Sequence, residues 1–219
     1  MRRWSGAGLL PIAAALLAFL FWDSPLLFPL KIFVVLLHEI SHGLAAVLTG
    51  GSIQSIQLGA DQGGVCVTRG GSRFLTLSAG YLGSLGFGAL LVLGAARSRR
   101  DRAVVALLGL ALLAVTLLFV RTAFGFAYGL LAGAGLLLVA RRLPEAVSDA
   151  VLRVLGAVSC LYAVWDIASD VLLRDVPGSD ASALARLTGI PAPAWGVLWI
   201  GVALAVTAFT FLKVAREGR

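Results

Sequence analysis

Long apolar runs constrain the fold of this chain more than any other feature. Ala103–Val120 contains no charged residue, and about 18 such residues are enough to cross the hydrocarbon core of a bilayer as a helix. Lipid admits only helices or closed barrels, because every backbone polar group must be satisfied internally. Barrel strands alternate with period two, whereas these runs are solid blocks of Leu, Ala and Val. We therefore predict an all-α polytopic membrane protein.

The composition supports this class. Hydrophobic residues make up 59% of the chain and charged residues 13%, about half the charged fraction of a soluble domain. The net charge of +7 does not indicate a nucleic-acid partner, because the basic residues lie mostly in the gaps between apolar runs, as they do in membrane-protein loops. The lipid bilayer is the partner that we expect.

We count about six to seven transmembrane segments in a single domain, 1–219. Leu9–Trp22 follows the basic start Arg2-Arg3 and lacks a small-residue cleavage site, so we interpret it as an uncleaved first span rather than a signal peptide. A polar loop, 174–193, contains a short helix that Ser179 caps and Gly189 ends. The remaining spans are Leu26–Leu48, Phe74–Ala96, Ala103–Val120, Ala123–Ala140, Val147–Leu173 and Ala194–Val214.

The segment 51–73 differs from the spans in its residue pattern. Two β-type runs, within Ser52–Arg69, flank a turn rich in Gly that contains Asp61. This pattern predicts a β-hairpin between the second and third spans, with a plain connecting loop as the alternative.

The orientation in the membrane stays open. The positive-inside bias places the Arg97–Arg102 cluster and the basic C-terminal tail in the cytoplasm. Strict alternation over seven spans then places Arg2 and Arg3 on the opposite side.

The chemistry is concentrated in His38, Glu39 and His42. Residues four apart share one face of a helix, so the two imidazoles can ligate one metal ion while Glu39 serves as general base. These are the only two histidines of the chain, and both lie in an apolar segment where ionisable residues are costly and usually functional. We predict one zinc per chain; the alternative is that the three side chains satisfy one another inside the bundle.

A catalytic zinc needs a third protein ligand. Asp166 and Asp170 lie four residues apart in an apolar run, and two such carboxylates repel each other unless a cation is near. We expect Asp166 to be the ligand, with Asp170 as the alternative or as its hydrogen-bond partner. Asp170 can instead pair with Arg174 at the helix end. We interpret Asp180 as part of a helix cap.

The cysteines carry no such signal. Cys66 and Cys160 have no Cys or His at ligand spacing, so we interpret both as small packing residues.

Taken together, the residues resemble the site-2 protease family of intramembrane zinc metalloproteases, and in particular its compact bacterial M50B-like branch. The residues His38–Gly43 resemble the family's zinc motif and lie in a predicted membrane helix. The glycine-rich segment 51–73 follows at the place where this family has a membrane-associated sheet. Ala79–Ser84 is similar to the family's small-residue motif. The resemblance implies that His38, His42 and a later aspartate bind zinc and that Glu39 is the base. It also implies that the hairpin Ser52–Arg69 binds an unwound substrate segment as an added strand.

The chain departs from the family pattern in two places. Tyr81 and Ser84 stand where the family usually has Pro and Asn, and the sequence contains no Asn. The Asp-Gly element near the third ligand is also absent, since Ile167 follows Asp166 and Val171 follows Asp170. These differences leave open which aspartate is the third ligand and how the oxyanion is held.

We therefore expect a zinc metallopeptidase that cleaves membrane-spanning or membrane-anchored proteins. Two alternatives belong to other classes: a non-catalytic membrane protein that binds a metal or a partner, and an ion-translocating protein that uses the intramembrane carboxylates. Usage of Ala, Gly and Arg with few Lys suggests a GC-rich bacterial genome and hence the bacterial cell membrane. The sequence does not define the oligomeric state.

Overall fold

The computed structural model describes residues 13, 17, 20, 21, 24–173 and 178–217. Within these residues, six helices are long and apolar enough to cross a membrane. The predicted helical membrane fold is confirmed, and the chain is an integral multi-pass membrane protein. The expected first span, Leu9–Trp22, lies mostly outside the described residues. The spanning helices are α2 (Phe28–Leu48), α3 (Arg73–Arg97), α4 (Asp101–Phe119), α5 (Ala123–Arg142), α6 (Glu145–Ile167) and α8 (Ala192–Glu217).

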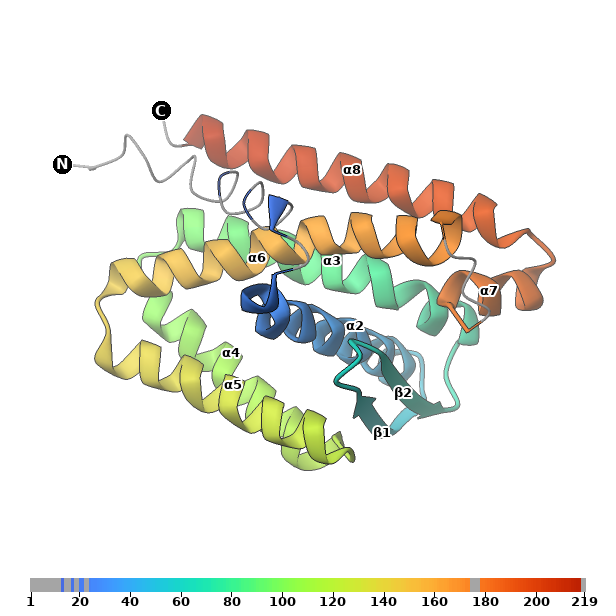
Figure 1. Cartoon of the computed structure of the whole chain (residues 1–219), viewed down its shortest axis with the longest axis horizontal. Helices are drawn as coiled ribbons and strands as arrows, with labels where there is room; N and C mark the ends of the chain where they lie inside the picture. Colours follow the sequence, from blue (N-terminus) through green and yellow to red (C-terminus); the bar gives the residue numbers. More distant parts are fainter. Residues whose placement is uncertain (1–12, 14–16, 18–19, 22–23, 174–177, 218–219) are drawn as a thin grey trace.

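Helices α2, α3 and α6 form the centre of the bundle (Figure 1). Helices α4 and α5 pair as a hairpin on one side, and α8 packs on α3 and α6 on the other. The central helix α2 is the most enclosed: a continuous run, Ile32–Leu37, is buried. A helix that is apolar and buried all round belongs at the core of a bundle.

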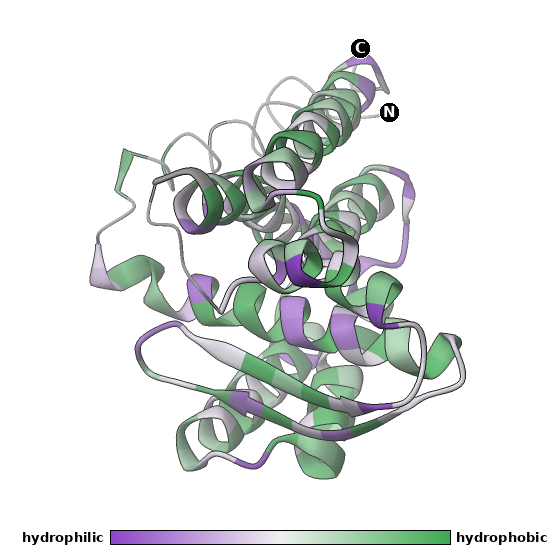
Figure 2. Ribbon diagram, turned by 90° about the vertical axis from the view of Figure 1, so that its right-hand side faces the viewer, coloured by the Kyte–Doolittle hydropathy of each residue, from purple (hydrophilic) through white to green (hydrophobic). Residues whose placement is uncertain are grey.

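The outer helices present apolar residues to the surroundings. Leu107, Leu110, Leu117 and Leu118 of α4 are more than half exposed, an arrangement that lipid tails accommodate and water does not. Hydrophobic residues cover most of the helices, while hydrophilic residues occur at loops, at places in the hairpin and at a few helix turns (Figure 2). The exposed faces of α4, α5 and α8 are therefore the lipid-facing surface.

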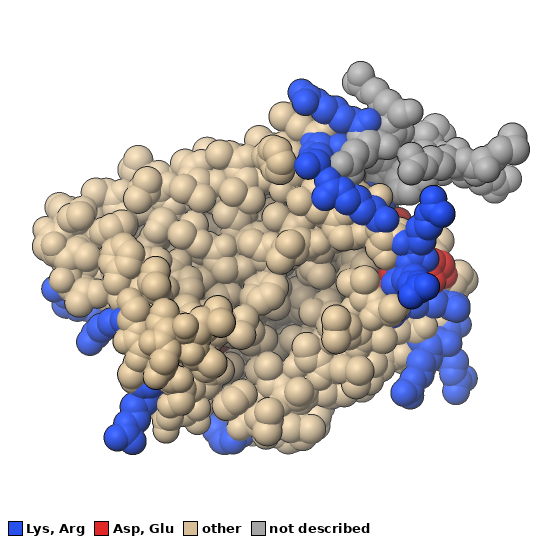
Figure 3. Space-filling view, turned by 180° about the vertical axis from the view of Figure 1, so that it is seen from behind, with Lys and Arg blue, Asp and Glu red and all other residues tan. Residues whose placement is uncertain are grey.

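The two ends of the bundle differ. The α3–α4 loop with its arginines 97–102, the α5–α6 loop with Arg141 and Arg142, and the end of α8 all lie at one end (Figure 1). Basic side chains gather there in the space-filling view (Figure 3). The hairpin and α7 (Asp180–Thr188) lie at the opposite end. Helix α7 begins after Ser179, which caps it, and ends before Gly189, as the sequence predicts.

The predicted hairpin is present as β1 (Ser52–Leu58) and β2 (Gly64–Arg69), paired antiparallel. The register shifts between Ile53 and Ser55, so Gln54 is an extra residue in β1. Without this bulge, Ile53 and Ile56 would point to opposite faces, because side chains alternate along a strand. With it, both pack against the core that contains α2.

The outer edge of β1 is tied to the link between α4 and α5. The N–H of Arg121 donates to the carbonyl of Ile56 at 3.0 Å, and the hydroxyl of Thr122 donates to the carbonyl of Leu58 at 2.8 Å. Val120 forms a parallel bridge with Ile56. The hairpin is therefore fixed on its β1 side, and β2 is its other edge.

Candidate active site

Helix α2 presents the motif residues on one face. His38, Glu39 and His42 all line a cavity of about 1250 Å³ at the hairpin end of the bundle. Their spacing puts them on one face of a helix, as the sequence predicts. Glu39 and His42 are buried within the bundle.

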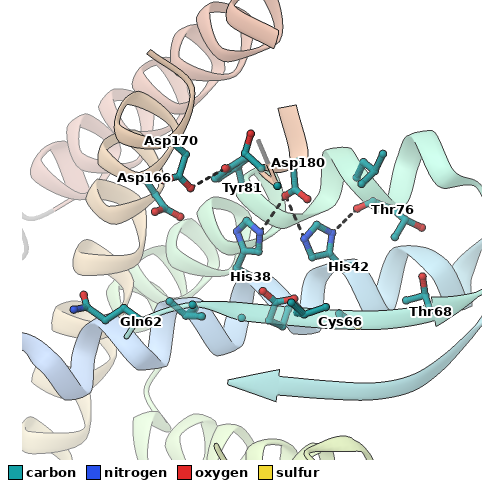
Figure 4. A pocket seen from close by; sticks show the side chains of 18 of the residues that line it. His38, His42, Gln62, Cys66, Thr68, Thr76, Tyr81, Asp166, Asp170 and Asp180 are labelled. Atoms are coloured by element: carbon teal, nitrogen blue, oxygen red, sulfur yellow. Dashed lines mark hydrogen bonds and ion pairs between the residues drawn. The ribbon is translucent and has the colours of Figure 1, made fainter. Parts of the chain in front are cut away.

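The third residue of the cluster is Asp180, at the first turn of α7. Its Oδ2 lies 3.1 Å from Nε2 of His38 and 3.2 Å from Nε2 of His42, and the three donor atoms lie within 4.8 Å of one another. Figure 4 shows the two imidazoles pointing at this carboxylate. Burial favours a higher pKa for Asp180, but the two histidines hold the pKa at about 2, so the group is a carboxylate.

A backbone carbonyl orients His42. Its Nδ1 lies 2.7 Å from the carbonyl oxygen of Thr76 on α3, and a carbonyl only accepts hydrogen bonds, so Nδ1 carries the proton. In the neutral ring, Nε2 then directs a lone pair at the Asp180 oxygen. Two lone pairs at this distance repel each other unless a proton or a metal cation lies between them. Metal-ligating histidines typically have this kind of partner on the other ring nitrogen.

The β2 strand holds Glu39. The backbone N–H of Cys66 is a hydrogen-bond donor to the Glu39 carboxylate, and the backbone of Gly64 lies directly against it. A Cβ on Gly64 would stand 2.5 Å from Oε1 of Glu39. The hairpin therefore sets the position of the carboxylate that the sequence predicts to be the base.

Gly80 of α3 provides the space in which the donor atoms meet. A Cβ at this position would stand 2.5 Å from Oδ2 of Asp180 and would also collide with Nε2 of His38. The small-residue motif 79–84 is thus explained by close approach of α3 to the site.

Asp166 and Asp170, the ligands expected from the sequence, do not join the cluster. Both line the cavity, but neither belongs to the group of converging donors that is found among the described residues. Asp170 accepts a hydrogen bond of 3.2 Å from the hydroxyl of Tyr81. Helix α6 ends at Ile167 and continues as a wider π-type turn, Ala168–Leu173, which contains Asp170 but not Asp166.

Asp180 is the residue that sequence reasoning assigned to another role. The interpretation of Asp180 as part of the helix cap is wrong. The capping side chain is that of Ser179, whose hydroxyl accepts the N–H of Ser182. A usable signal was present: Ala181 and Leu184 make one face of this short helix apolar, and both are fully buried. A short helix with such an apolar face must pack on the bundle, and Asp180, the first residue of this helix, is brought to the bundle with it.

Of the other residues considered, Asp61 lies in the hairpin turn as expected and accepts the N–H of Gly63. Cys66 and Cys160 are free cysteines. Burial, with the nearby Glu39, raises the pKa of the Cys66 thiol to about 12. Its sulfur does not belong to the group of converging donors found among the described residues.

Comparison with known proteins supports the resemblance seen in the sequence. Searches of curated proteins and of solved structures found no match. A family model described as Peptidase M50B-like matches residues 11–210, which includes every residue of the site. The chain therefore belongs to the peptidase M50B-like family and is a site-2 protease-like membrane protein.

Proposed function

We propose that this protein is an intramembrane zinc metalloendopeptidase that cleaves membrane-spanning or membrane-anchored proteins. His38, His42 and Asp180 hold the zinc ion, and Glu39 is the general base. The observation that carries the proposal is the convergence of three donor atoms within 4.8 Å beside a buried glutamate.

The donor set fits zinc. Two imidazole nitrogens and one carboxylate oxygen are typical of catalytic zinc sites, which leave a further position open for water or substrate. Tetrahedral ligands at about 2.0–2.1 Å from zinc lie about 3.3 Å apart, and the separations of 3.1 and 3.2 Å from Asp180 to the histidines are close to this value.

The residues divide the chemistry between them. Bound zinc would polarise the scissile carbonyl and activate a water molecule. Glu39 takes the proton of the attacking water and delivers it to the leaving amine. The Cys66 N–H keeps the Glu39 carboxylate in place, and the Thr76 carbonyl keeps His42 in the tautomer that presents Nε2 to the site.

The β2 edge supports a protein substrate. Backbone groups alternate between the two edges of a strand, so Gly64 and Thr68 share the edge on which Cys66 meets Glu39, and all three line the cavity. A helical substrate must unwind before its amide can be attacked, and hydrogen bonds to an added strand offset that cost.

Zinc content is the direct test. We expect about one zinc per chain in detergent-purified wild type and in Glu39→Gln, and a large loss in His38→Ala and Asp180→Ala. Asp166→Ala is the matched control, because it removes a cavity carboxylate outside the donor cluster. Loss of zinc in Asp166→Ala with retention in Asp180→Ala would overturn the ligand assignment.

Activity separates this function from the alternatives. A protease loses cleavage of a membrane-anchored substrate in Glu39→Gln while it keeps its zinc. Zinc binding in a protein whose Glu39→Gln variant is as functional as wild type would support a metal-binding or partner-binding role. Ion flux across proteoliposomes without zinc would support translocation.

A further inference from the structure

The two histidines of the candidate site are held in different ways. Nδ1 of His42 lies 2.7 Å from the carbonyl oxygen of Thr76, and this bond fixes both the ring and its tautomer. His38 has a polar contact with Asp180 at Nε2, and its ring contacts two other rings. A side chain that is mobile before binding loses conformational entropy when it becomes a ligand. The rings that pack on His38 therefore affect how well it is prepared to bind a metal.

Tyr81 of α3 is one of these two rings, and it is not itself a candidate ligand. The ring centroids of Tyr81 and His38 are 4.9 Å apart, and their planes meet at 82°. This is the edge-to-face arrangement that aromatic rings favour. The second ring is that of His42, with its centroid 4.7 Å from that of His38. The support that His38 receives from a ring outside the donor set thus comes from Tyr81.

Tyr81 is itself anchored to other elements of the bundle. It is only 2% exposed, and its hydroxyl donates to Oδ2 of Asp170 at 3.2 Å. Its ring also contacts Trp199 of α8, with the centroids 5.4 Å apart. Figure 4 shows Tyr81 beside Asp170 and above His38. The π-type turn and α8 therefore hold the Tyr81 ring at the place where it meets His38.

The backbone of α3 explains why the contact is so close. Gly80, the residue before Tyr81, leaves the space that Nε2 of His38 occupies, because a Cβ at this position would collide with it. Two consecutive residues of opposite size thus meet the same imidazole. Gly80 makes room for the donor atom, and Tyr81 packs on the ring that carries this atom.

We propose that Tyr81 is a positioning residue of the candidate metal site: its anchored ring holds the imidazole of His38 so that Nε2 points toward Asp180. The proposal rests on the proposed function, because the metal in question is the proposed zinc ion. It assigns Tyr81 no contact with zinc or with substrate. Asp170 then acts on the site through the Tyr81 hydroxyl and not as a ligand.

Zinc affinity, measured by competition with a chromophoric chelator in detergent, tests this role. Tyr81→Leu keeps an apolar side chain and removes the ring, so we expect zinc binding to weaken by at least about tenfold, as when a group that orients a ligand is lost. Tyr81→Phe keeps the ring and its edge-to-face contact, so its affinity stays within about threefold of wild type. Equal affinities of wild type and Tyr81→Leu overturn the proposal. Equal losses in Tyr81→Phe and Tyr81→Leu overturn it too, because the ring would then contribute nothing.

The matched control is Tyr128→Leu. Tyr128 is a partly buried tyrosine of α5 whose hydroxyl donates to the carbonyl of Pro29 at 2.6 Å, and it lies outside the described lining of the cavity. We expect this variant to bind zinc as wild type does. A loss as large as that in Tyr81→Leu would show a general effect of removing a tyrosine from the bundle and would overturn the positioning role.

Imidazole NMR signals of the metal-free protein test the positioning without zinc. The chain has only two histidines, so a His42→Gln sample assigns both sets of signals. In Tyr81→Leu, we expect the signals of His38 to broaden or to divide, while those of His42 stay narrow because Thr76 still holds its ring. Tyr81→Phe keeps the single narrow set for His38. Equal changes in both histidines, or no change in either, contradict the proposal, because a merely structural role of Tyr81 would not single out His38.

Cleavage assays separate this proposal from the proposed function. If zinc affinity depends on the Tyr81 ring but wild type cleaves no membrane-anchored protein, the hydrolase function fails and the positioning role stands. If wild type cleaves such a protein and Tyr81→Leu binds zinc as tightly as wild type, the positioning role fails and the hydrolase function stands.

Discussion

Gly80 leaves the space in which the candidate donor atoms meet, and it contributes no donor atom itself. Because a Cβ there collides with His38 and Asp180, we expect Gly80→Ala to weaken zinc binding by at least about tenfold, the loss typical of disturbed ligand support. Gly86→Ala is the control, since a Cβ at Gly86 of the same helix has nothing within 4 Å. Zinc titration of both variants checks this; equal affinities would contradict the close packing of α3 on the site.

Gly64 has the corresponding role for the base. Gly64→Ala displaces the Glu39 carboxylate, so we expect kcat to fall by about 100-fold, as when a catalytic group is misplaced by about 1 Å. Zinc content stays unchanged, because Glu39 is not a ligand. Gly63→Ala is the neighbouring control, because a Cβ there would lie no closer than 3.4 Å to its nearest neighbours, which are side-chain atoms of the exposed turn residue Asp61. A similar loss of kcat in both variants would indicate a general effect on the hairpin.

The sequence predicts the members of the candidate site that lie within one helix, and it does not predict that Asp180 lies beside them. His38, Glu39 and His42 share a face through helical spacing alone, which needs no knowledge of the fold. Asp166 lies in an apolar run, where a carboxylate indicates function, whereas Asp180 lies in a polar loop, where a carboxylate is ordinary. Proximity to the two histidines is a tertiary property, and neither local feature contains it.

At the scale of elements, α7 delivers Asp180 by docking. Leu184 is fully buried, whereas Leu187 of the same helix is 46% exposed. Removing a buried leucine side chain costs about 2–5 kcal/mol, so we expect Leu184→Ala to weaken zinc affinity although it touches no ligand. Leu187→Ala leaves the affinity near that of wild type, and zinc titration compares the two. A loss that is the same in both would show that α7 positions Asp180 in another way.

Most elements were predictable because their signals are local. The long helices follow from apolar runs, and the hairpin follows from two β-type runs around a glycine-rich turn. The bulge at Gln54 and the π-type turn after Ile167 were not predicted. Both are accompanied by contacts with distant parts of the chain: Ile53 and Ile56 pack against the core, and Asp170 accepts a hydrogen bond from Tyr81.

At the scale of the whole molecule, the proposed zinc ion would connect the first described spanning helix with the polar loop before the last one. A ligand that binds only the folded state stabilises it by about 2.7 kcal/mol at 100 times its Kd. We therefore expect a chelator to lower the Tm of the detergent-solubilised protein by several degrees and added zinc to restore it. Asp180→Ala shows no such response to zinc. A thermal scan with and without chelator checks this, and an equal response in both proteins would contradict the bridge.

The link between α4 and α5 has a consequence for how copies of this protein meet one another. Exposed sheet edges are sites at which separate molecules join into larger β-assemblies. Here Arg121 and Thr122 occupy one edge of the two-stranded sheet, and the other edge faces the interior of the protein's own cavity. A crowded membrane can therefore hold many copies without the hairpin of one nucleating aggregation with the next.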